Sequence, residues 1–325
     1  FQPVVRVPVQ PLAPLLGSVR NRKVTSLNGQ WRYIVDQLGV GDASPLLRGG
    51  VGEDADYTSS ELLEYSFAGG DTLQVPGDWN SQHDALFWYR GIVWYQRDFD
   101  YQLAQGRRLF LYFGGANYAK DVYLNGTLIA RHKGGFTPFN TEITSYLRAG
   151  SNSIVVKVDS QSGPAEVPTE YNDWLNYGGI TRDVMLVETP SAFVGNFKLQ
   201  LARGSRETLQ GWVQLHGGTP GQAVRLRIPE AEVDKTFRVD AQGRAKILFN
   251  AELSLWSPQN PQLYDVEWSI EQDTLRDQVG FRTIETDGKD ILLNGEPVFL
   301  RGISLHEESL LGPGRAHSEA HAQAV

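Results

Sequence analysis

The chain has 325 residues, of which 41% are apolar and 21% charged; this balance excludes a disordered chain and predicts two or three globular domains. Its formal net charge of −8 argues against a nucleic-acid partner, whose phosphates require a basic surface. No window of about 20 apolar residues occurs, so we expect no membrane span.

Two residue types that are scarce here carry information. Cysteine is absent, which excludes disulfides, thiolate catalysis and cysteine-bound zinc. The chain begins with Phe1 and its only methionine is Met185, so we expect that an N-terminal segment has been removed, either as a cleaved signal peptide or by trimming of the sequence. This expectation favours a periplasmic or secreted location over a cytoplasmic one.

Residues 1–190 are expected to form one large antiparallel β-sandwich. An extended arm over residues 1–25 is kept non-helical by repeated prolines. Short alternating strands follow, at 107–115, 119–132 and 152–160, with few helix signals. Asn125-Gly126 lies between two such runs and predicts a tight hairpin with positive φ at the turn.

A second series of strands begins after "VETPSAFVGNF" (187–197). Roughly seven short strands fit into residues 191–285, which is the size of an immunoglobulin-like sandwich. Because no disulfide is available, packing alone must hold this core.

Residues 286–325 change character. Asn294-Gly295 predicts a turn, and "PVFLRGISL" (297–305) is nearly continuous in apolar residues, which is typical of a parallel strand buried on both faces. Ser318 is a good N-cap for an Ala-rich helix that follows. A strand, a loop and a helix would form the first βα unit of a truncated (β/α)₈ barrel.

An acidic residue in an aromatic loop is the first candidate for a binding site. Asp173 lies in "EYNDWLNYGGITRDV" (170–184), next to Trp174. A carboxylate accepts hydrogen bonds from sugar hydroxyls while aromatic rings cover the apolar face of the sugar. The alternative is that Asp173 caps a local turn.

The cluster His306-Glu307-Glu308 is the second candidate. Active sites of (β/α)₈ barrels lie at the carboxyl ends of their strands, where this cluster is predicted to fall. His306 would bind a hydroxyl or a metal. Adjacent residues on an extended backbone point in opposite directions, so the two glutamates are poorly placed as an acid/base pair. A merely solvated loop is the alternative.

Two further signals have structural explanations. The segment 76–99 contains five Trp and Tyr residues, which suit either an aromatic core or sugar stacking. Asn125-Gly126-Thr127 is formally a glycosylation sequon, but its Asn-Gly pair serves the hairpin. Phosphate loops, dinucleotide fingerprints, Gly-x-Ser-x-Gly and paired zinc-binding histidines do not occur in the sequence.

Several motifs, taken in order, resemble glycoside hydrolase family 2, which includes β-galactosidases, β-glucuronidases and β-mannosidases. They are "SLNGQWRY" (26–33), "VPGDWN" (75–80), "WYRGIVWYQRDF" (88–99), "VYLNGTLIARHKGGFTPFNTEIT" (122–144), "NYGGITRDVML" (176–186) and "LLNGEPVFLRGISLHEE" (292–308). The sequences of these motifs are most similar to those of β-glucuronidase-like and shorter β-galactosidase-like members.

The resemblance implies a mainly β chain: a jelly-roll-like sugar-binding sandwich, an immunoglobulin-like sandwich and the start of a catalytic barrel. It implies a retaining exo-β-glycosidase that hydrolyses terminal β-linked sugars, with β-galactosides or β-glucuronides favoured. Such enzymes use two glutamates about 5–5.5 Å apart. In the family both lie deep in the barrel, so this chain is expected to contain no catalytic residue and to be inactive alone.

The resemblance also assigns binding roles. It implies that Asp173 and His306 contact the sugar, and Trp174 and Glu307 are added as neighbouring contacts. Ser304 stands where relatives often have Asn. We expect no cofactor and no metal ligands in the chain, although galactosidase-like members admit a sodium or magnesium ion. The implied partners are a carbohydrate substrate, the remainder of the barrel and other copies of the full-length enzyme.

Two other classes compete with this hypothesis. A stand-alone carbohydrate-binding module would need no parallel strand ending in His-Glu, so the segment 286–325 favours the glycosidase. A purely structural or adhesive β protein predicts no sugar affinity at Asp173 or the rings beside it.

Overall fold

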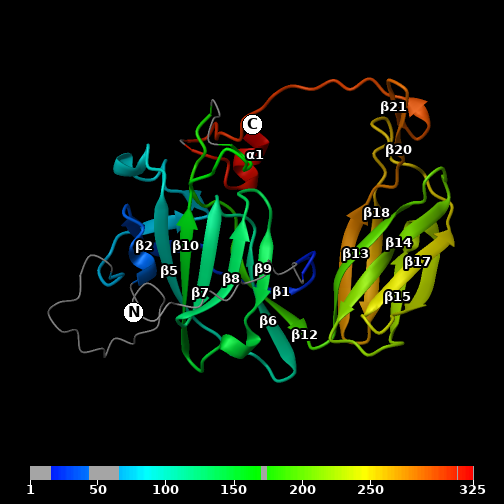
Figure 1. Cartoon of the computed structure of the whole chain (residues 1–325). Helices are drawn as coiled ribbons and strands as arrows, with labels where there is room; N and C mark the ends of the chain where they lie inside the picture. Colours follow the sequence, from blue (N-terminus) through cyan, green and yellow to red (C-terminus); the bar gives the residue numbers. More distant parts are fainter. Residues whose placement is uncertain (1–15, 44–65, 170–173, 313, 325) are drawn as a thin grey trace.

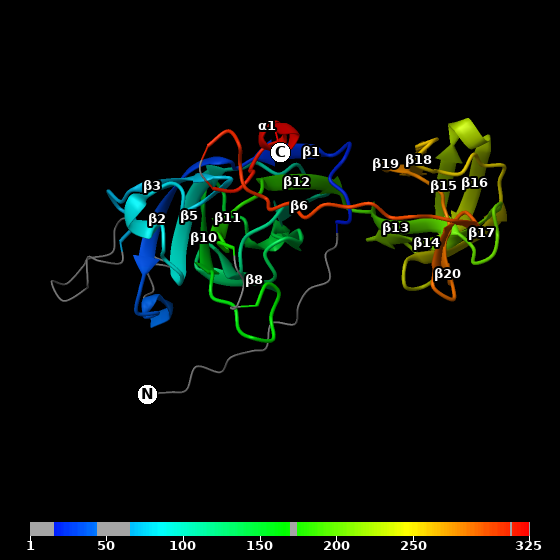
Figure 2. The ribbon, with the colours of Figure 1, turned by 90° about the horizontal axis from the view of Figure 1, so that it is seen from above.

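The computed structural model describes residues 16–43, 66–169, 174–312 and 314–324. It shows two β-sandwiches side by side, joined by a short connection and by a long strand-free segment that leads to the C-terminal helix (Figures 1 and 2). The prediction of a mainly β chain is therefore confirmed.

The first sandwich packs a four-stranded sheet on a six-stranded sheet, and every strand pair in them is antiparallel. The smaller sheet has the order β1 (Lys23–Ser26), β12 (Val184–Pro190), β6 (Arg107–Phe113) and β9 (Phe139–Glu142). The larger has the order β3 (Thr72–Val75), β2 (Gly29–Asp36), β5 (Ile92–Asp100), β10 (Ser151–Asp159), β7 (Ala119–Leu124) and β8 (Thr127–Lys133).

Alternating residues of the two sheets meet in one core. Trp31, Tyr95 and Val156 come from the larger sheet, and Leu111 and Leu186 from the smaller. The predicted hairpin at Asn125-Gly126 is confirmed: both residues have positive φ and they connect β7 to β8. Short 3₁₀ turns, η1 (Gly41–Ala43), η4 (Asp84–Leu86) and η5 (Thr144–Tyr146), lie in the connections.

The second sandwich contains seven strands in two sheets. One has the order β13 (Phe193–Leu201), β14 (Thr208–His216) and β17 (Arg244–Asn250), and the other β16 (Val233–Arg238), β15 (Ala223–Ile228), β18 (Tyr264–Ile270) and β19 (Asp273–Val279); η6 (Pro229–Ala231) links β15 to β16. In β15 the odd positions are exposed and Val224, Leu226 and Ile228 are buried, so one face of the sheet meets the core around Trp268.

The two sandwiches meet at a buried arginine. Arg22 lies just before β1, donates a hydrogen bond to the carbonyl of Val194 at 2.5 Å, and pairs with Asp273 at 3.7 Å. Burial lowers the pKa of Arg22, and the charge of Asp273 opposes that effect. Phe193 packs edge-on against Phe110, with ring centroids 5.4 Å apart. The connection between the sandwiches is thus fixed by charge and by ring packing.

The segment after the second sandwich differs from the prediction. β20 (Ile284–Asp287), β21 (Asp290–Leu293) and β22 (Glu296–Pro297) form a small antiparallel sheet, and the predicted turn at Asn294-Gly295 connects β21 to β22 with positive φ at both residues. A helix begins after Ser318, whose hydroxyl accepts a hydrogen bond from the amide of His321: α1 (Glu319–Ala324).

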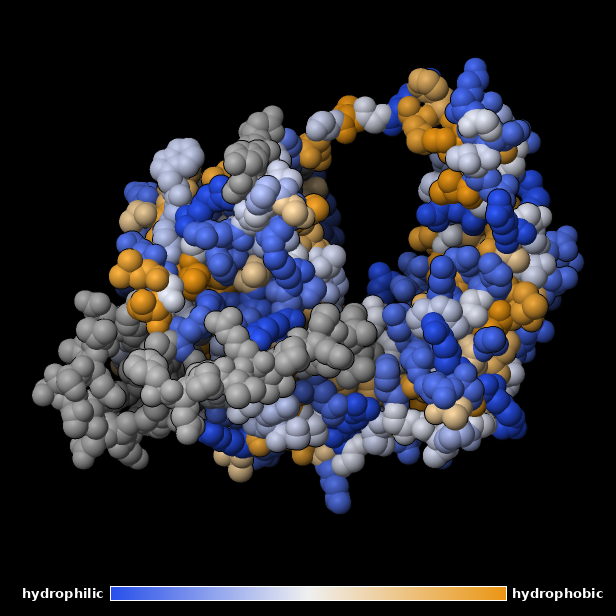
Figure 3. Space-filling view, viewed as in Figure 1, coloured by the Kyte–Doolittle hydropathy of each residue, from blue (hydrophilic) through white to orange (hydrophobic). Residues whose placement is uncertain are grey.

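The buried strand predicted over 297–305 does not form. Residues 298–307 have no strand, and Phe299 and Ile303 are 83% and 90% exposed. In Figure 3 this segment is a narrow bridge of apolar and polar residues above the gap between the sandwiches. The physical reason is that a strand with two apolar faces needs neighbours on both sides, and no described strand pairs with it. The start of a barrel is therefore not confirmed.

Candidate functional site

The structure brings together three of the four predicted binding residues. Trp174, His306 and Glu307 line one hollow of about 370 Å³, together with Phe136, Leu175, Tyr177, Ser304, Leu305, Glu308 and Arg315. The rings of Trp174 and His306 lie 6.3 Å apart at 53°. Asp173, the fourth, falls outside the described residues. The hollow combines aromatic walls with carboxylates and cationic groups, which suits a polar ring-shaped ligand.

The loop that carries Trp174 is fixed on the first sandwich by amide side chains. Asn80 Oδ1 accepts a hydrogen bond from the amide of Gly178 at 2.8 Å, and Asn117 Nδ2 donates to the carbonyl of Tyr177 at 2.6 Å. Gly178 lies flat against a buried indole: a Cβ there would lie 2.1 Å from Trp79 Cζ2. Only glycine therefore fits at this position without moving the loop.

Two short strands lie next to Gly178 and pair with each other. β4 (Gly77–Asp78) pairs with β11 (Gly179–Ile180), and Asp78 lies opposite Gly179. This pairing places the Asp78 carboxylate, which is completely buried, beneath the segment that returns from the second sandwich.

Asp78 anchors the returning segment. Its Oδ1 accepts a hydrogen bond from the amide of Ser81 at 2.7 Å, and its Oδ2 accepts from the amide of Arg315 at 3.3 Å and lies 2.9 Å from His317 Nε2. Burial acts to raise the pKa of Asp78, but the hydrogen bonds from His317 and Ser81 outweigh it and lower the pKa. A Cβ at Gly314 would lie 2.5 Å from Asp78 Oδ2, so the chain approaches closely here.

Glu307 forms a second attachment. Its carboxylate pairs with Arg182 of the first sandwich and with Arg315 of the returning segment. The Arg315 guanidinium lies 4.9 Å from the centre of the Phe136 ring, and burial lowers the pKa of Arg315 to about 10. Both oxygens of Glu307 are thus engaged by guanidinium groups, so in this arrangement the side chain holds the segment in place.

The two adjacent glutamates contact different partners. Glu308 interacts with the hydroxyl of Tyr177; burial and this carboxylate together raise the pKa of Tyr177. Glu307 instead faces Arg182 and Arg315. This divergence agrees with the prediction that the pair is poorly placed to cooperate as acid and base.

Sequence reasoning missed four residues of this arrangement: Asp78, Arg182, Arg315 and His317. The motif "VPGDWN" was noted, but its aspartate was not singled out, although a lone carboxylate between apolar residues signals a buried acceptor. No motif in the sequence marks His317.

The aromatic segment 76–99 is mostly core. Trp79, Trp94 and Tyr95 are fully or almost fully buried, which confirms the core interpretation for them, whereas Trp88 is exposed. The Asn125 side chain donates to the carbonyl of Tyr146 and to Asn152, so its amide is used within the fold.

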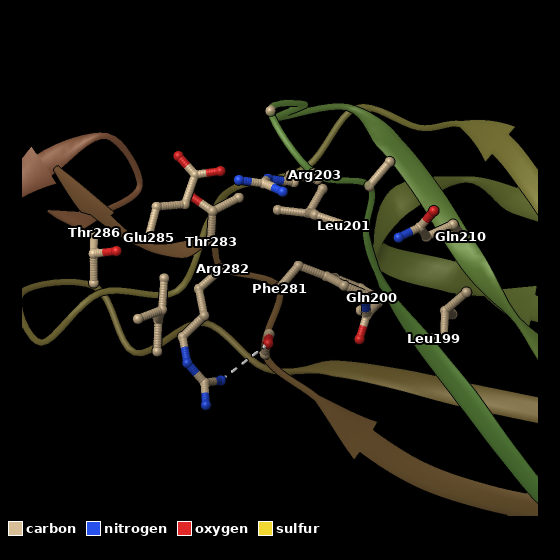
Figure 4. Close-up of a pocket in the computed structure, with 14 residues that line it drawn as sticks. Leu199, Gln200, Leu201, Arg203, Gln210, Phe281, Arg282, Thr283, Glu285 and Thr286 are labelled. Atoms are coloured by element: carbon tan, nitrogen blue, oxygen red, sulfur yellow. Dashed lines mark hydrogen bonds between the residues drawn. The ribbon is translucent and has the colours of Figure 1, made fainter. Parts of the chain in front are cut away.

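A larger hollow, of about 920 Å³, lies in the second sandwich (Figure 4). Residues 199–204 and 280–286 line it with Gln210, and Arg282 donates to the carbonyl of Gly280 across a distance of 3.4 Å. Trp174, His306 and Glu307, the three predicted binding residues that the structure describes, do not line it. The smaller hollow is the one that contains these three residues.

Metal ligands do not cluster in the described ranges: no group of three or more His, Asp or Glu side chains is placed to hold an ion. In the part of the chain that the structure describes, no helix has both the length and the apolar character needed to cross a membrane.

Comparison with known proteins identifies the class. The model "Glycosyl hydrolases family 2, sugar binding domain" matches residues 24–190, and the model "Glycosyl hydrolases family 2" matches residues 204–282. The first match alone covers more than half of the chain. The chain therefore belongs to glycosyl hydrolase family 2.

Individual relatives are glucuronidases and galactosidases by name. A putative β-glucuronidase of Formosa agariphila is 29% identical over 79% of this chain and 33% of its own length, and a β-galactosidase of Thermoanaerobacter pseudethanolicus is 28% identical over 88% and 39%. The solved β-glucuronidase of an uncultured Clostridium sp. superposes with a TM-score of 0.74 at 26% identity, covering 95% of this chain and 53% of that one. The chain thus spans about a third to a half of these relatives.

Proposed function

We propose that the chain is the N-terminal, non-catalytic part of a retaining exo-β-glycosidase that removes terminal β-linked galactose or glucuronate. Family membership and the names of the relatives support the reaction class, and the share of each relative that is covered supports the assignment to the N-terminal part. The observation that carries the proposal is the attachment of residues 304–308 beside Trp174, which brings His306 into the aromatic hollow.

In this proposal the chain divides into a sugar-binding sandwich (1–190), an immunoglobulin-like sandwich (191–285) and the start of a catalytic barrel (286–325). The exposed apolar side chains between Phe299 and Leu305 suit a strand that the remainder of the barrel would cover. A complete barrel needs about 250 residues. The two catalytic glutamates would lie in that remainder, and neither Glu307 nor Glu308 is assigned to the chemistry.

Each group in the hollow has a proposed role toward the terminal sugar. His306 donates a hydrogen bond to a hydroxyl, and Trp174 covers an apolar face of the ring. Asp173, from the same loop, accepts hydrogen bonds from hydroxyls. Glu307 keeps His306 in position through its pairs with Arg182 and Arg315.

The test uses the whole protein that contains this chain. We expect it to hydrolyse a p-nitrophenyl β-galactoside or β-glucuronide, and we expect the isolated 325-residue chain to hydrolyse neither. His306→Ala should lower kcat/KM by roughly 10- to 100-fold, because the variant loses one hydrogen bond to a hydroxyl of the substrate. The exposed His83, outside the hollow, provides the control variant His83→Ala. Hydrolysis of no β-glycoside in a broad panel would refute the proposal, and sugar binding without hydrolysis would favour a carbohydrate-binding module.

A further inference from the structure

Two exposed aromatic rings lie on the first sandwich outside the hollow. Phe87 and Trp88 follow η4, in the cyan segment before β5 in Figure 1, and are 42% and 79% exposed. Their rings meet edge to face with centroids 4.7 Å apart. The other aromatic residues of this segment are buried or half-buried. We call Phe87 and Trp88 the aromatic pair; neither ring contributes to a hydrophobic core.

The backbone that carries the aromatic pair is held on both sides. Asn80 Nδ2 donates to three carbonyls of this turn, those of Leu86, Phe87 and Tyr89, at 2.9, 3.1 and 3.1 Å. Trp79 Nε1 also donates to the carbonyl of Tyr89, at 3.2 Å, and Leu86 is buried in the core. The rings are therefore presented on a fixed turn, which limits the conformational entropy lost when a ligand binds.

The size of the aromatic pair argues for a small ring-shaped ligand. An aromatic side chain buries at most about 150–250 Å², whereas a specific protein–protein contact needs about 800 Å² on each partner. Exposed residues close to the pair in the chain are mostly polar, among them His83, Asp84 and Arg90. An apolar platform within a polar rim complements a pyranose ring, whose C–H face is apolar and whose hydroxyls point outward.

A shared side chain links the aromatic pair to the hollow. The two ends of the Asn80 amide act on different elements: the oxygen holds Gly178 of the Trp174 loop, and the nitrogen holds the turn that carries Phe87. The aromatic pair does not line the hollow. The first sandwich therefore presents two separate aromatic surfaces that one asparagine fixes.

We propose that the aromatic pair is an accessory carbohydrate site, at which Trp88 stacks on a pyranose of a glycan chain while Phe87 supports the indole from the side. The polar rim supplies hydrogen bonds to the hydroxyls of the same sugar. The site is distinct from the hollow that contains His306, and it binds sugar without cleaving it.

The experiment measures glycan binding and hydrolysis separately in the whole protein. The binding probes are soluble β-galactan and hyaluronan, whose sugars match the proposed substrates, assayed by affinity gel electrophoresis. Trp88→Ala is expected to weaken retention by one of them roughly 10- to 100-fold, as the loss of a stacked ring predicts. Tyr146→Ala, another exposed aromatic residue of the same sandwich, is the matched control and should not change retention.

Hydrolysis of a p-nitrophenyl glycoside should be unchanged in Trp88→Ala, because so small a substrate does not reach the aromatic pair. Equal retention of wild type and Trp88→Ala would overturn the proposal, and so would protection of Trp88 from iodide quenching in the glycan-free protein. The gel assay measures glycan binding and does not depend on hydrolysis. A protein that hydrolyses no glycoside would therefore refute the proposed function, while the retention of Trp88→Ala would still test the accessory site.

Discussion

Replacing Asp78 by alanine should release the returning segment from the first sandwich. Of the three hydrogen bonds that the carboxylate accepts, two come from this segment, through the amide of Arg315 and the ring of His317. Hydrogen bonds to a charged group contribute about 1.5–3 kcal/mol each. The attachment of the segment should therefore weaken by about 3–6 kcal/mol, which increases its detached population at least about 100-fold.

Hydrogen exchange measured by mass spectrometry tests this on peptides that cover residues 305–318. We expect exchange of the Arg315 amide to accelerate in Asp78→Ala, and exchange in the second sandwich to stay unchanged. Asp240→Ala is the matched control, because Asp240 also accepts two backbone hydrogen bonds, from Gln242 and Arg244, but in a surface turn of the second sandwich. Unchanged exchange at 305–318 in Asp78→Ala would refute the reasoning, because it would show that the ion pairs of Glu307 alone keep the segment attached.

The pH dependence of this attachment follows from the same carboxylate. The pKa of Asp78 is lowered in the folded protein. Its contribution is therefore complete above the unfolded pKa, about 3.9, and is lost as the pH falls through the lower folded value. Protection of residues 305–318 from exchange, corrected for the intrinsic exchange rate, should decrease in that acid range in the wild-type protein. The decrease should be smaller in Asp78→Ala, where only the ion pairs of Glu307 still attach the segment.

Two further variants test the support of the site. Lys120→Met should destabilise the first sandwich by about 2–4 kcal/mol, because the buried Lys120 ammonium donates to the carbonyls of Ala116, Tyr118 and Gly134, which would lose their donor. Denaturant unfolding followed by tryptophan fluorescence measures this loss, and an unchanged unfolding midpoint would contradict it. Gly178→Ala should displace the Trp174 loop, because the new methyl group would overlap the Trp79 ring; the expected loss of folding stability is about 1–3 kcal/mol or more. The kcat/KM of the whole protein should fall, and wild-type kinetics would show that the loop accommodates the methyl group.

Local signals in the sequence predicted the strands well. The Asn125-Gly126 turn and the alternation in β15 depend on residues close together in the chain, and such patterns identify a hairpin or a half-buried strand directly. The segment 297–305 shows the limit of this reasoning. Its composition is that of a buried strand, but burial needs partner strands, and composition does not supply them.

The site was predictable only in part, for a related reason. His306 and Trp174 were identified from motifs, but the groups that hold them were not. Asp78 is separated by 237 residues from Arg315 and by 239 from His317. Contacts over such separations depend on the path by which residues 307–317 return to the first sandwich, and spacing in the sequence does not reveal that path.

The path of the chain between the sandwiches has a mechanical consequence. The polypeptide leaves the first sandwich at Pro190, builds the second, and comes back to the first at Glu307. The strand-free residues 298–306 span at most about 3.3–3.6 Å each, so this segment is about 30 Å long when fully extended. A rotation of the second sandwich that lengthens the path beyond this limit must pull on His306 directly. In the chain as described, residues 298–306 therefore couple the position of the second sandwich to that of His306.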